Sequence, residues 1–159
     1  MKKSKKILIV GGTGFIGYHL AKKCLRKRWH IVSFSKNKPR KERRLKKINY
    51  LIGDLSNLKD LKNINQKYDY VVNLGGYVDH NNKTKTYNSH FIGCKNLANI
   101  FLRKKIKSFV QVGSSGEYGK FKSPQIELGR GKPKSIYARS KFLASNYLLK
   151  LFKKTKFPV

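Results

Sequence analysis

The stretch from residue 7 to residue 17, which reads ILIVGGTGFIG, constrains the fold of this chain more than any other. Four consecutive aliphatic residues at 7–10 predict a strand buried on both faces, because no polar side chain interrupts them. Gly11, Gly14 and Gly17 follow at a spacing of three, and residues 15–28 have helical periodicity. The glycines therefore stand where a strand passes into a helix.

Such a junction is suited to hold a pyrophosphate, because the first helical turn has unpaired N–H groups and partial positive charge. Gly11 is expected to permit the tight turn, Gly14 the close approach of a cofactor, and Gly17 the packing of helix on strand. Phe15 and Ile16 lie in that first turn and are expected beside the cofactor. A glycine-rich turn without a ligand is the alternative, but strand, spacing and helix together favour a dinucleotide.

Strands and helices alternate along the rest of the chain. Strands are expected at 30–35, 50–53, 70–74 and 109–113, and helices at 55–64, 87–104 and 136–154. This order predicts an α/β fold, a doubly wound parallel sheet (Rossmann fold) with helices on both faces and right-handed crossovers. We expect residues 1–159 to form one NAD(P)-binding domain, which stops where a further strand would begin.

The chain is strongly basic, with 38 Lys and Arg against 7 Asp and Glu and a net charge of +31. That balance suggests nucleic acid or an anionic surface as a partner. The basic residues are scattered, however, without a nucleic-acid-binding motif, so we expect a solvated surface and no specific nucleic-acid partner. The first apolar run is too short for a signal or a membrane span, and Cys24 and Cys94 lack metal spacing. These features predict a cytoplasmic protein without a metal.

The end of the second predicted strand bears on the choice of cofactor. An acid about 20 residues beyond the glycines would hold a ribose 2′-hydroxyl, whereas a basic or hydroxyl group suits a 2′-phosphate. Ser35 and Lys36 stand there, Arg40 follows, and no acid occurs before Glu42. The pattern favours NADP over NAD, with Arg40 as the first candidate because a guanidinium can hold a phosphate through two hydrogen bonds. A solvated basic loop is the alternative.

Two further strand ends carry candidate cofactor contacts. Asp54 and Leu55 follow the third strand, where Asp54 is expected to contact the adenine or to cap the next helix, two roles that remain open. Leu74, Gly75 and Gly76 follow the fourth strand, and the paired glycines would let the backbone approach the cofactor's ribose and diphosphate. A turn without a ligand would also explain the glycines.

The candidate catalytic residues lie near the end of the chain. Tyr137 and Lys141 are four residues apart on a predicted helix and therefore share a face. A nearby ammonium stabilises tyrosinate, as a tyrosine that exchanges protons near neutrality requires. Ser114, after the fifth strand, would hold a substrate oxygen beside it. Hydride transfer at a nicotinamide would then be matched by proton transfer at Tyr137.

The Tyr-x-x-x-Lys spacing alone is weak evidence in a lysine-rich chain. It occurs also at Tyr18 and at Tyr118, the latter paired with Lys122, but only Tyr137 follows the fifth strand and a pair of serines. Position in the chain therefore selects Tyr137. The histidines are interpreted as unclustered and offer no rival centre: His19, His30, His80 and His90.

Five motifs stand in the order typical of one family: GGTGFIG, GDL at 53–55, NLGG at 73–76, GSSGEYG at 113–119 and YARSK at 137–141. The chain thereby resembles the extended short-chain dehydrogenase/reductases, in particular the nucleotide-sugar epimerase/dehydratase branch. The resemblance implies Tyr137 as acid/base, Lys141 on the nicotinamide ribose and Asp54 near the adenine. It also implies Ser114 as partner of the substrate oxygen, with Ser115 as the fallback.

Two departures accompany the resemblance. The family usually has Asn three residues before the glycine of its fourth helix, where this chain has His90 before Gly93, and the effect on a proton relay is open. Family members usually run to about twice this length, with a carboxyl-terminal substrate domain that this chain lacks.

The resemblance implies an NAD(P)-dependent epimerase, dehydratase or reductase acting on a nucleotide-sugar. The alternative is a non-catalytic NAD(P)-binding fragment, or half of a split protein that needs a partner to supply the substrate domain. The helices at 87–104 and 136–154 correspond to the family's usual dimer surface, so a homodimer is possible.

Overall fold

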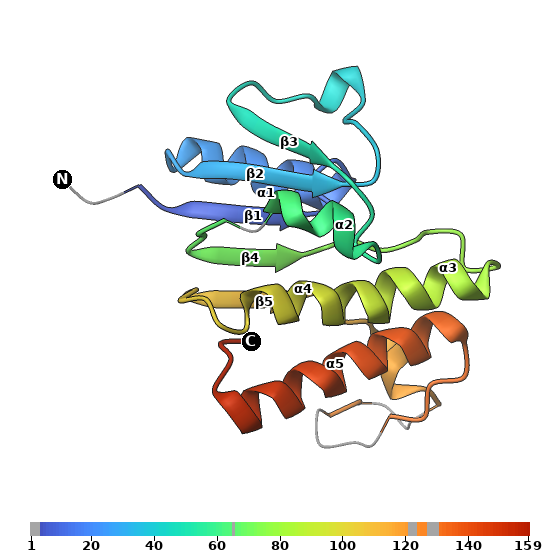
Figure 1. The fold of residues 1–159 in the computed structure, drawn as a ribbon. Coiled ribbons are helices and arrows are strands. Elements are labelled where there is room, and N and C mark those ends of the chain that lie inside the picture. The colour runs from blue at the N-terminus through green and yellow to red at the C-terminus, as the bar shows by residue number, and fades with distance from the viewer. Residues whose placement is uncertain (1–3, 65, 121–123, 127–130) are drawn as a thin grey trace.

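Five parallel strands form the centre of the molecule in the computed structural model, which describes residues 4–64, 66–120, 124–126 and 131–159. The strand order is β3-β2-β1-β4-β5 and every neighbouring pair is parallel (Figure 1). This is the doubly wound arrangement that the alternation of strands and helices predicts. The strands are β1 (Lys6–Val10), β2 (His30–Ser35), β3 (Ile48–Ile52), β4 (Tyr70–Asn73) and β5 (Ser108–Gln111).

Helices cover both faces of the sheet. Alternate residues of β1 point to opposite faces, so the strand contributes to a hydrophobic core on each side. Ile7 and Ile9 pack in one core cluster with residues of α1 (Phe15–Arg26). Leu8 and Val10 belong to a second cluster on the other face, which includes residues of α4 (Gly93–Phe101) and α5 (Ile136–Thr155). The unbroken aliphatic run of β1 is thus explained by burial on both sides.

Two helices differ from their expected bounds by more than two residues. The helix expected at 55–64 is a short α2 (Leu58–Leu61) followed by a 3-10 turn, η2 (Lys62–Ile64), and Asn57 caps it. The helix expected at 87–104 begins earlier as α3 (Lys83–Tyr87), because Asn82 provides an N-cap, and it ends with α4 at Phe101. Between α3 and α4 lies a π-helical turn, η3 (Asn88–Ile92), which periodicity does not reveal. Two 3-10 turns complete the fold: η1 (Lys41–Arg43) and η4 (Ser115–Tyr118).

The chain winds in two directions from β1, which places a switch point between β1 and β4. In open parallel sheets, ligands bind at the carboxyl ends of the strands at such a point. After α5 the chain returns to the outer edge of β5, where the Phe109 N–H donates to the Pro158 carbonyl at 2.8 Å. No helix within the described ranges combines the length and the apolar character needed to cross a bilayer.

Candidate functional site

The glycine turn after β1 has the geometry expected of it. Gly11 has a φ of +76° and its N–H donates to the Phe34 carbonyl at 2.8 Å. A Cβ on Gly17 would overlap the Gly11 carbonyl oxygen, so helix α1 can approach the turn only with glycine there. The predictions of a tight turn at Gly11 and of close packing at Gly17 are both confirmed.

The first turn of α1 faces outward. Gly14 is its N-cap, and a Cβ there would meet only the Gly11 carbonyl oxygen, at 3.3 Å. Phe15 and Ile16 are 65% and 60% exposed. In the described part of the chain no side chain caps these first N–H groups. The turn therefore offers backbone donors of the kind that bind phosphate.

The end of β2 brings a cation against an acid. Ser35 is buried, and its hydroxyl accepts from the Thr13 N–H at 3.3 Å. The Lys36 ammonium pairs with the Asp54 carboxylate at 2.8 Å, although the Lys36 side chain is largely exposed. Arg40 is exposed as the N-cap of η1.

Arg43, one of the basic residues that follow Arg40 in the sequence, lies with its guanidinium 5.7 Å from the centre of the Phe15 ring. This cation–π contact joins the basic loop after β2 to the first turn of α1. A basic residue among several neighbours gives no sign in the sequence that it reaches the glycine turn.

Asp54 does not cap the following helix. One of its oxygens accepts from the N–H and hydroxyl of Ser56, the other binds Lys36, and Asn57 caps α2 by accepting from the Lys59 N–H. Burial alone would raise the pKa of Asp54, but the hydrogen bonds from Lys36 and Ser56 outweigh it and lower that pKa. The capping alternative was wrong because Asn57 stands closer to the helix. Leu55, next in the chain, is buried in the core.

The turn after β4 lies against the glycine turn after β1. A Cβ on Gly11 would come within 2.9 Å of the Leu74 carbonyl, and the Leu74 N–H donates to the Val10 carbonyl at 3.0 Å. The Asn73 side chain accepts from the Gly75 N–H at 3.1 Å, while Gly76 is exposed. The structure thus brings together the two glycine segments at the switch point.

Tyr137 and Lys141 lie in the first turns of α5, at the same edge of the sheet. The Lys141 ammonium is buried at 6% exposure and donates to the carbonyl of Val112, the residue after β5, at 2.9 Å. Burial lowers the pKa of Lys141, and the nearby Glu117 carboxylate opposes that effect. A bond from α5 to the end of β5 therefore fixes the lysine, and Tyr137 is half-buried beside it.

Ser114 has a structural task that the sequence did not reveal. Its hydroxyl accepts from the Gly116 N–H at 3.2 Å, and its own N–H donates to the Glu117 carboxylate at 2.7 Å. This capping box starts η4, which packs on α5 at Ala138. Ser115 is exposed, and Lys122, the partner expected for Tyr118, lies outside the described residues.

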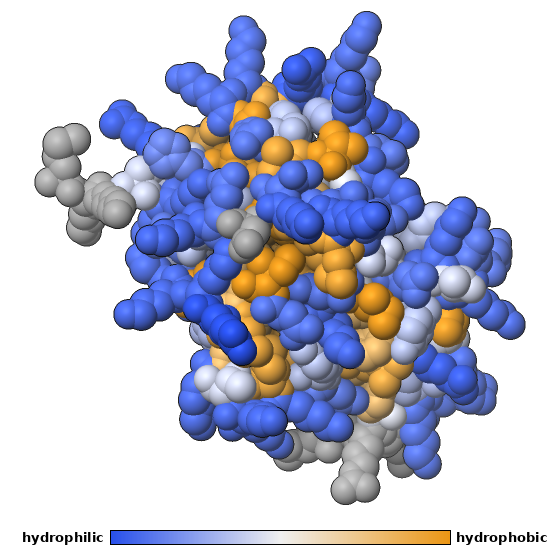
Figure 2. Space-filling model, in the orientation of Figure 1, coloured by the Kyte–Doolittle hydropathy of each residue, from blue (hydrophilic) through white to orange (hydrophobic). Residues whose placement is uncertain are grey.

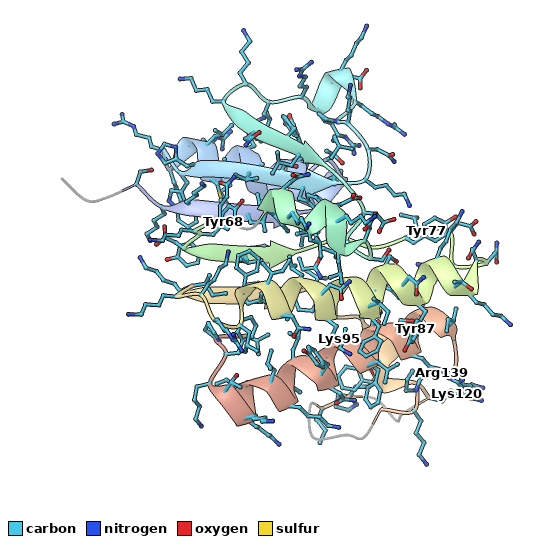
Figure 3. The ribbon with its side chains drawn as sticks, viewed as in Figure 1. Tyr68, Tyr77, Tyr87, Lys95, Lys120 and Arg139 are labelled. Atoms are coloured by element: carbon cyan, nitrogen blue, oxygen red, sulfur yellow. The ribbon has the colours of Figure 1, made fainter. Side chains whose placement is uncertain are left out.

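Two histidines surround Tyr137, which corrects the interpretation that the histidines are unclustered. The His80 ring stacks on the Tyr137 ring at 4.2 Å between centroids, and the His90 ring meets it edge-on at 5.0 Å. The two imidazoles are 5.9 Å apart. Figure 3 labels Tyr77, whose carbonyl contacts His90, beyond the carboxyl end of β4 and far from Tyr68 at the other end. Within the described ranges no three His, Cys, Asp or Glu side chains gather to hold a metal.

The sequence model of the NAD dependent epimerase/dehydratase family matches residues 7–159. The chain belongs to this family. The match spans both glycine segments and the Tyr137–Lys141 helix, so the five motifs belong to one family pattern.

Relatives within the epimerase/dehydratase family are longer. A bifunctional UDP-glucose 4-epimerase and UDP-xylose 4-epimerase of Pisum sativum is 25% identical over 157 residues, covering 87% of this chain and 45% of that protein. The structure of the Thermus thermophilus UDP-glucose 4-epimerase with NAD has a TM-score of 0.83 at 20% identity, covering 96% of this chain and 52% of that one. The structure of the Campylobacter jejuni UDP-Glc/GlcNAc 4-epimerase has a TM-score of 0.85 at 23% identity, covering 96% of this chain and 50% of that one. The chain spans about half the length of these proteins, and the likeness to the solved structures shows the fold.

Proposed function

We propose that this chain forms the cofactor-binding part of an NAD(P)-dependent epimerase/dehydratase that acts on a nucleotide-linked sugar. The observation that carries the proposal is the meeting, at one edge of the sheet, of the glycine turn, the β4 turn and the buried Lys141 beside Tyr137. Relatives described as UDP-sugar epimerases support the substrate class. Residues 1–159 then correspond to one NAD(P)-binding domain.

In this proposal the cofactor's diphosphate lies over the first turn of α1. The N–H groups there have no capping side chain among the described residues, and Gly14 is exposed beside them. Gly75 and Gly76 border the ribose and diphosphate from the β4 side, with Leu74 behind them. Asp54 and Leu55 lie toward the adenine.

We favour NADP over NAD because β2 ends in a hydroxyl and a cation. A carboxylate would be needed there to accept hydrogen bonds from a free ribose 2′-hydroxyl. Ser35 is followed by Lys36, whose charge already offsets Asp54, and Arg40 and Arg43 lie on η1 and its cap. A 2′-phosphate would therefore meet cations rather than an unpaired acid.

Tyr137 is proposed as the acid/base. It acts as the phenolate, which the Lys141 ammonium stabilises, and it becomes the neutral phenol when it takes the proton from a sugar hydroxyl. Lys141 also contacts the nicotinamide ribose. The bound nicotinamide supplies the acceptor for the hydride from the same sugar carbon. The Ser114 hydroxyl accepts one hydrogen bond, from the Gly116 N–H. A hydroxyl can also donate, so this group can donate a hydrogen bond to the substrate oxygen.

The decisive experiment is a titration of NAD and NADP against the 159-residue chain and its Tyr137→Phe variant, followed by addition of a UDP-sugar. We expect both proteins to bind both cofactors, NADP more tightly, and the variant to lose hydride transfer to the nicotinamide by roughly a hundredfold or more. Tyr18→Phe removes the tyrosine of another Tyr-x-x-x-Lys pair and should change neither property. Calorimetry measures binding, and the absorbance of reduced nicotinamide measures transfer.

Each other outcome has a definite meaning. Unchanged transfer in Tyr137→Phe refutes the acid/base role. If the unmodified chain binds a cofactor but transfers no hydride, it is a module that holds the nucleotide and needs a partner for catalysis. The match to only 45% of the Pisum sativum relative is consistent with that outcome. Failure to bind either cofactor overturns the proposal as a whole.

A further inference from the structure

His90 occupies an unusual place in the helix that covers the switch point. It lies in the middle of the π-helical turn η3, where the α-helical spacing of α3 and α4 is interrupted. Such turns are rare within helices and are frequently found at functional sites. Here the imidazole is 6% exposed and meets the Tyr137 ring at 81°.

One hydrogen bond fixes the form of this imidazole. His90 Nε2 lies 3.2 Å from the Tyr77 carbonyl oxygen. Since a carbonyl oxygen only accepts, Nε2 carries the proton, and Nδ1 of the neutral ring has a lone pair. Nδ1 is buried and has no hydrogen-bond partner among the described residues.

The imidazole stays neutral because of what surrounds it. Burial lowers the pKa of His90 to about 4, and the charge of Lys141 and the neighbouring His80 act in the same direction. The groups facing His90 are therefore the Tyr77 carbonyl and His80 from the segment after β4, and Tyr137 and Lys141 from α5. A protonated ring would bring a second positive charge beside the buried Lys141 ammonium.

Gly76 makes room for the ring. A Cβ on Gly76 would overlap Cε1 of His90 and come within 2.6 Å of its Nδ1. The imidazole also contacts the rings of Tyr137 and His80, so a shift away from such a methyl group would disturb these contacts. The second glycine of the β4 turn thus has a steric reason that needs no cofactor.

We propose that His90 is a positioning residue for Tyr137, and that Gly76 and His90 are a matched pair in which the missing Cβ of one admits the ring of the other. The His90 ring packs against the phenol ring and adds no charge to the site. The consequence for catalysis rests on the proposed acid/base role of Tyr137, whereas the pairing itself does not.

A double-mutant cycle measured by thermal unfolding tests the pairing. Gly76→Ala in the unmodified chain should lower Tm by about 4 °C or more, because the methyl group displaces the packed ring. In a His90→Ala background the same change should have little effect. Gly75→Ala is the matched control, since its Cβ would meet Val10 at 2.9 Å rather than His90, and its cost should be the same in both backgrounds.

The positioning role has a spectroscopic readout in the ring signals of Tyr137, labelled with 13C and assigned with Tyr137→Phe. His90→Ala and Gly76→Ala should both move and broaden these signals. His90→Phe, which keeps a ring, should largely restore them, and His19→Ala should leave them in place. None of these measurements requires the cofactor.

Equal costs of Gly76→Ala in both backgrounds, or Tyr137 signals that ignore the His90 variants, overturn the inference. If the coupling is found but Tyr137→Phe retains hydride transfer, the pairing stands and the acid/base proposal falls. If Tyr137→Phe loses hydride transfer but Gly76 and His90 show no coupling, the acid/base proposal stands and the pairing is refuted.

Discussion

At the scale of single residues, burial and its partners decide what the candidate groups can do. Lys141 is fixed by a carbonyl at 2.9 Å, Asp54 is ionised against Lys36, and His90 is held neutral. Cys94, which donates to the Gln111 side chain at 3.2 Å, has its pKa raised to about 12 by burial and is therefore a thiol rather than a nucleophile. Burial, charge and hydrogen bonds thus shift the pKa of each of these groups from its ordinary value.

His90 should make the stability of the protein depend on pH. Its pKa falls from 6.5 in the unfolded chain to about 4 when folded, so between these values the unfolded state binds the additional proton. As far as His90 is concerned, the free energy of unfolding is therefore highest above pH 6.5, and it decreases by up to about 3 kcal/mol as the pH falls toward 4. Denaturant unfolding across this range should give a flatter profile for His90→Asn.

The comparison between variants is needed because Asp54 acts with the same sign. Its lowered pKa also gives stability that is lost as the pH falls, and that loss is common to both proteins. Parallel profiles for the unmodified chain and His90→Asn would contradict the predicted role of His90.

At the scale of elements, the site is built where strands end and helices begin. The β1–α1 turn has glycine at two places that differ in their surroundings, since a Cβ on Gly17 would overlap the Gly11 carbonyl oxygen, whereas one on Gly14 would lie 3.3 Å from it. The π-helical turn η3 positions His90, and the capping box of η4 positions Ser114. Regular helix and strand alone would not bring them together.

The two glycines of this turn should therefore respond differently to alanine. Gly17→Ala should destabilise the fold by about 1–3 kcal/mol, because the methyl group must push α1 away from the turn. Gly14→Ala should change stability by less than about 1 kcal/mol yet weaken binding of NADP, because the methyl group fills the space beside the first N–H groups. Unfolding and calorimetry on both variants measure the two effects.

The contrast between the two variants tests the explanation more strictly than either measurement alone. A Gly14→Ala variant with normal cofactor affinity would argue against a diphosphate at this turn. A stable Gly17→Ala variant would show that the helix can shift without cost.

At the scale of the whole molecule, charge dominates the surface. A net charge of +31 is spread over 159 residues, and Figure 2 shows hydrophilic side chains over much of the visible face, with hydrophobic atoms between them. The two ion pairs found among the described residues are Lys36 with Asp54 and Lys107 with Asp69, both partly exposed. Self-repulsion therefore opposes the compact state.

Salt should stabilise this protein. Raising the ionic strength from about 0.01 M to about 0.1 M shortens the Debye length from about 30 Å to about 10 Å, so repulsion between distant cations fades. We expect Tm to rise by a few degrees, equivalent to about 1 kcal/mol in a domain of this size. Thermal unfolding in sodium and in potassium chloride separates ionic strength from specific ion effects, and a Tm that falls with salt would count against the explanation.

The amino-acid sequence by itself determined the sheet and the turn that opens it. The aliphatic run at β1, the glycine spacing and the alternation of elements are local patterns, and each follows from backbone sterics and burial that neighbouring residues define. The same holds for Tyr137 and Lys141, which share a face because they are four residues apart.

Tertiary structure alone decided which distant groups meet. His80 and His90 come to Tyr137, Lys36 to Asp54, and Arg43 to Phe15 through crossovers and a π turn that leave no mark in local periodicity. Gly76 owes its steric necessity to a side chain on another element, η3. Contacts of this kind depend on packing between elements, so their physical cause exists only once the chain has folded.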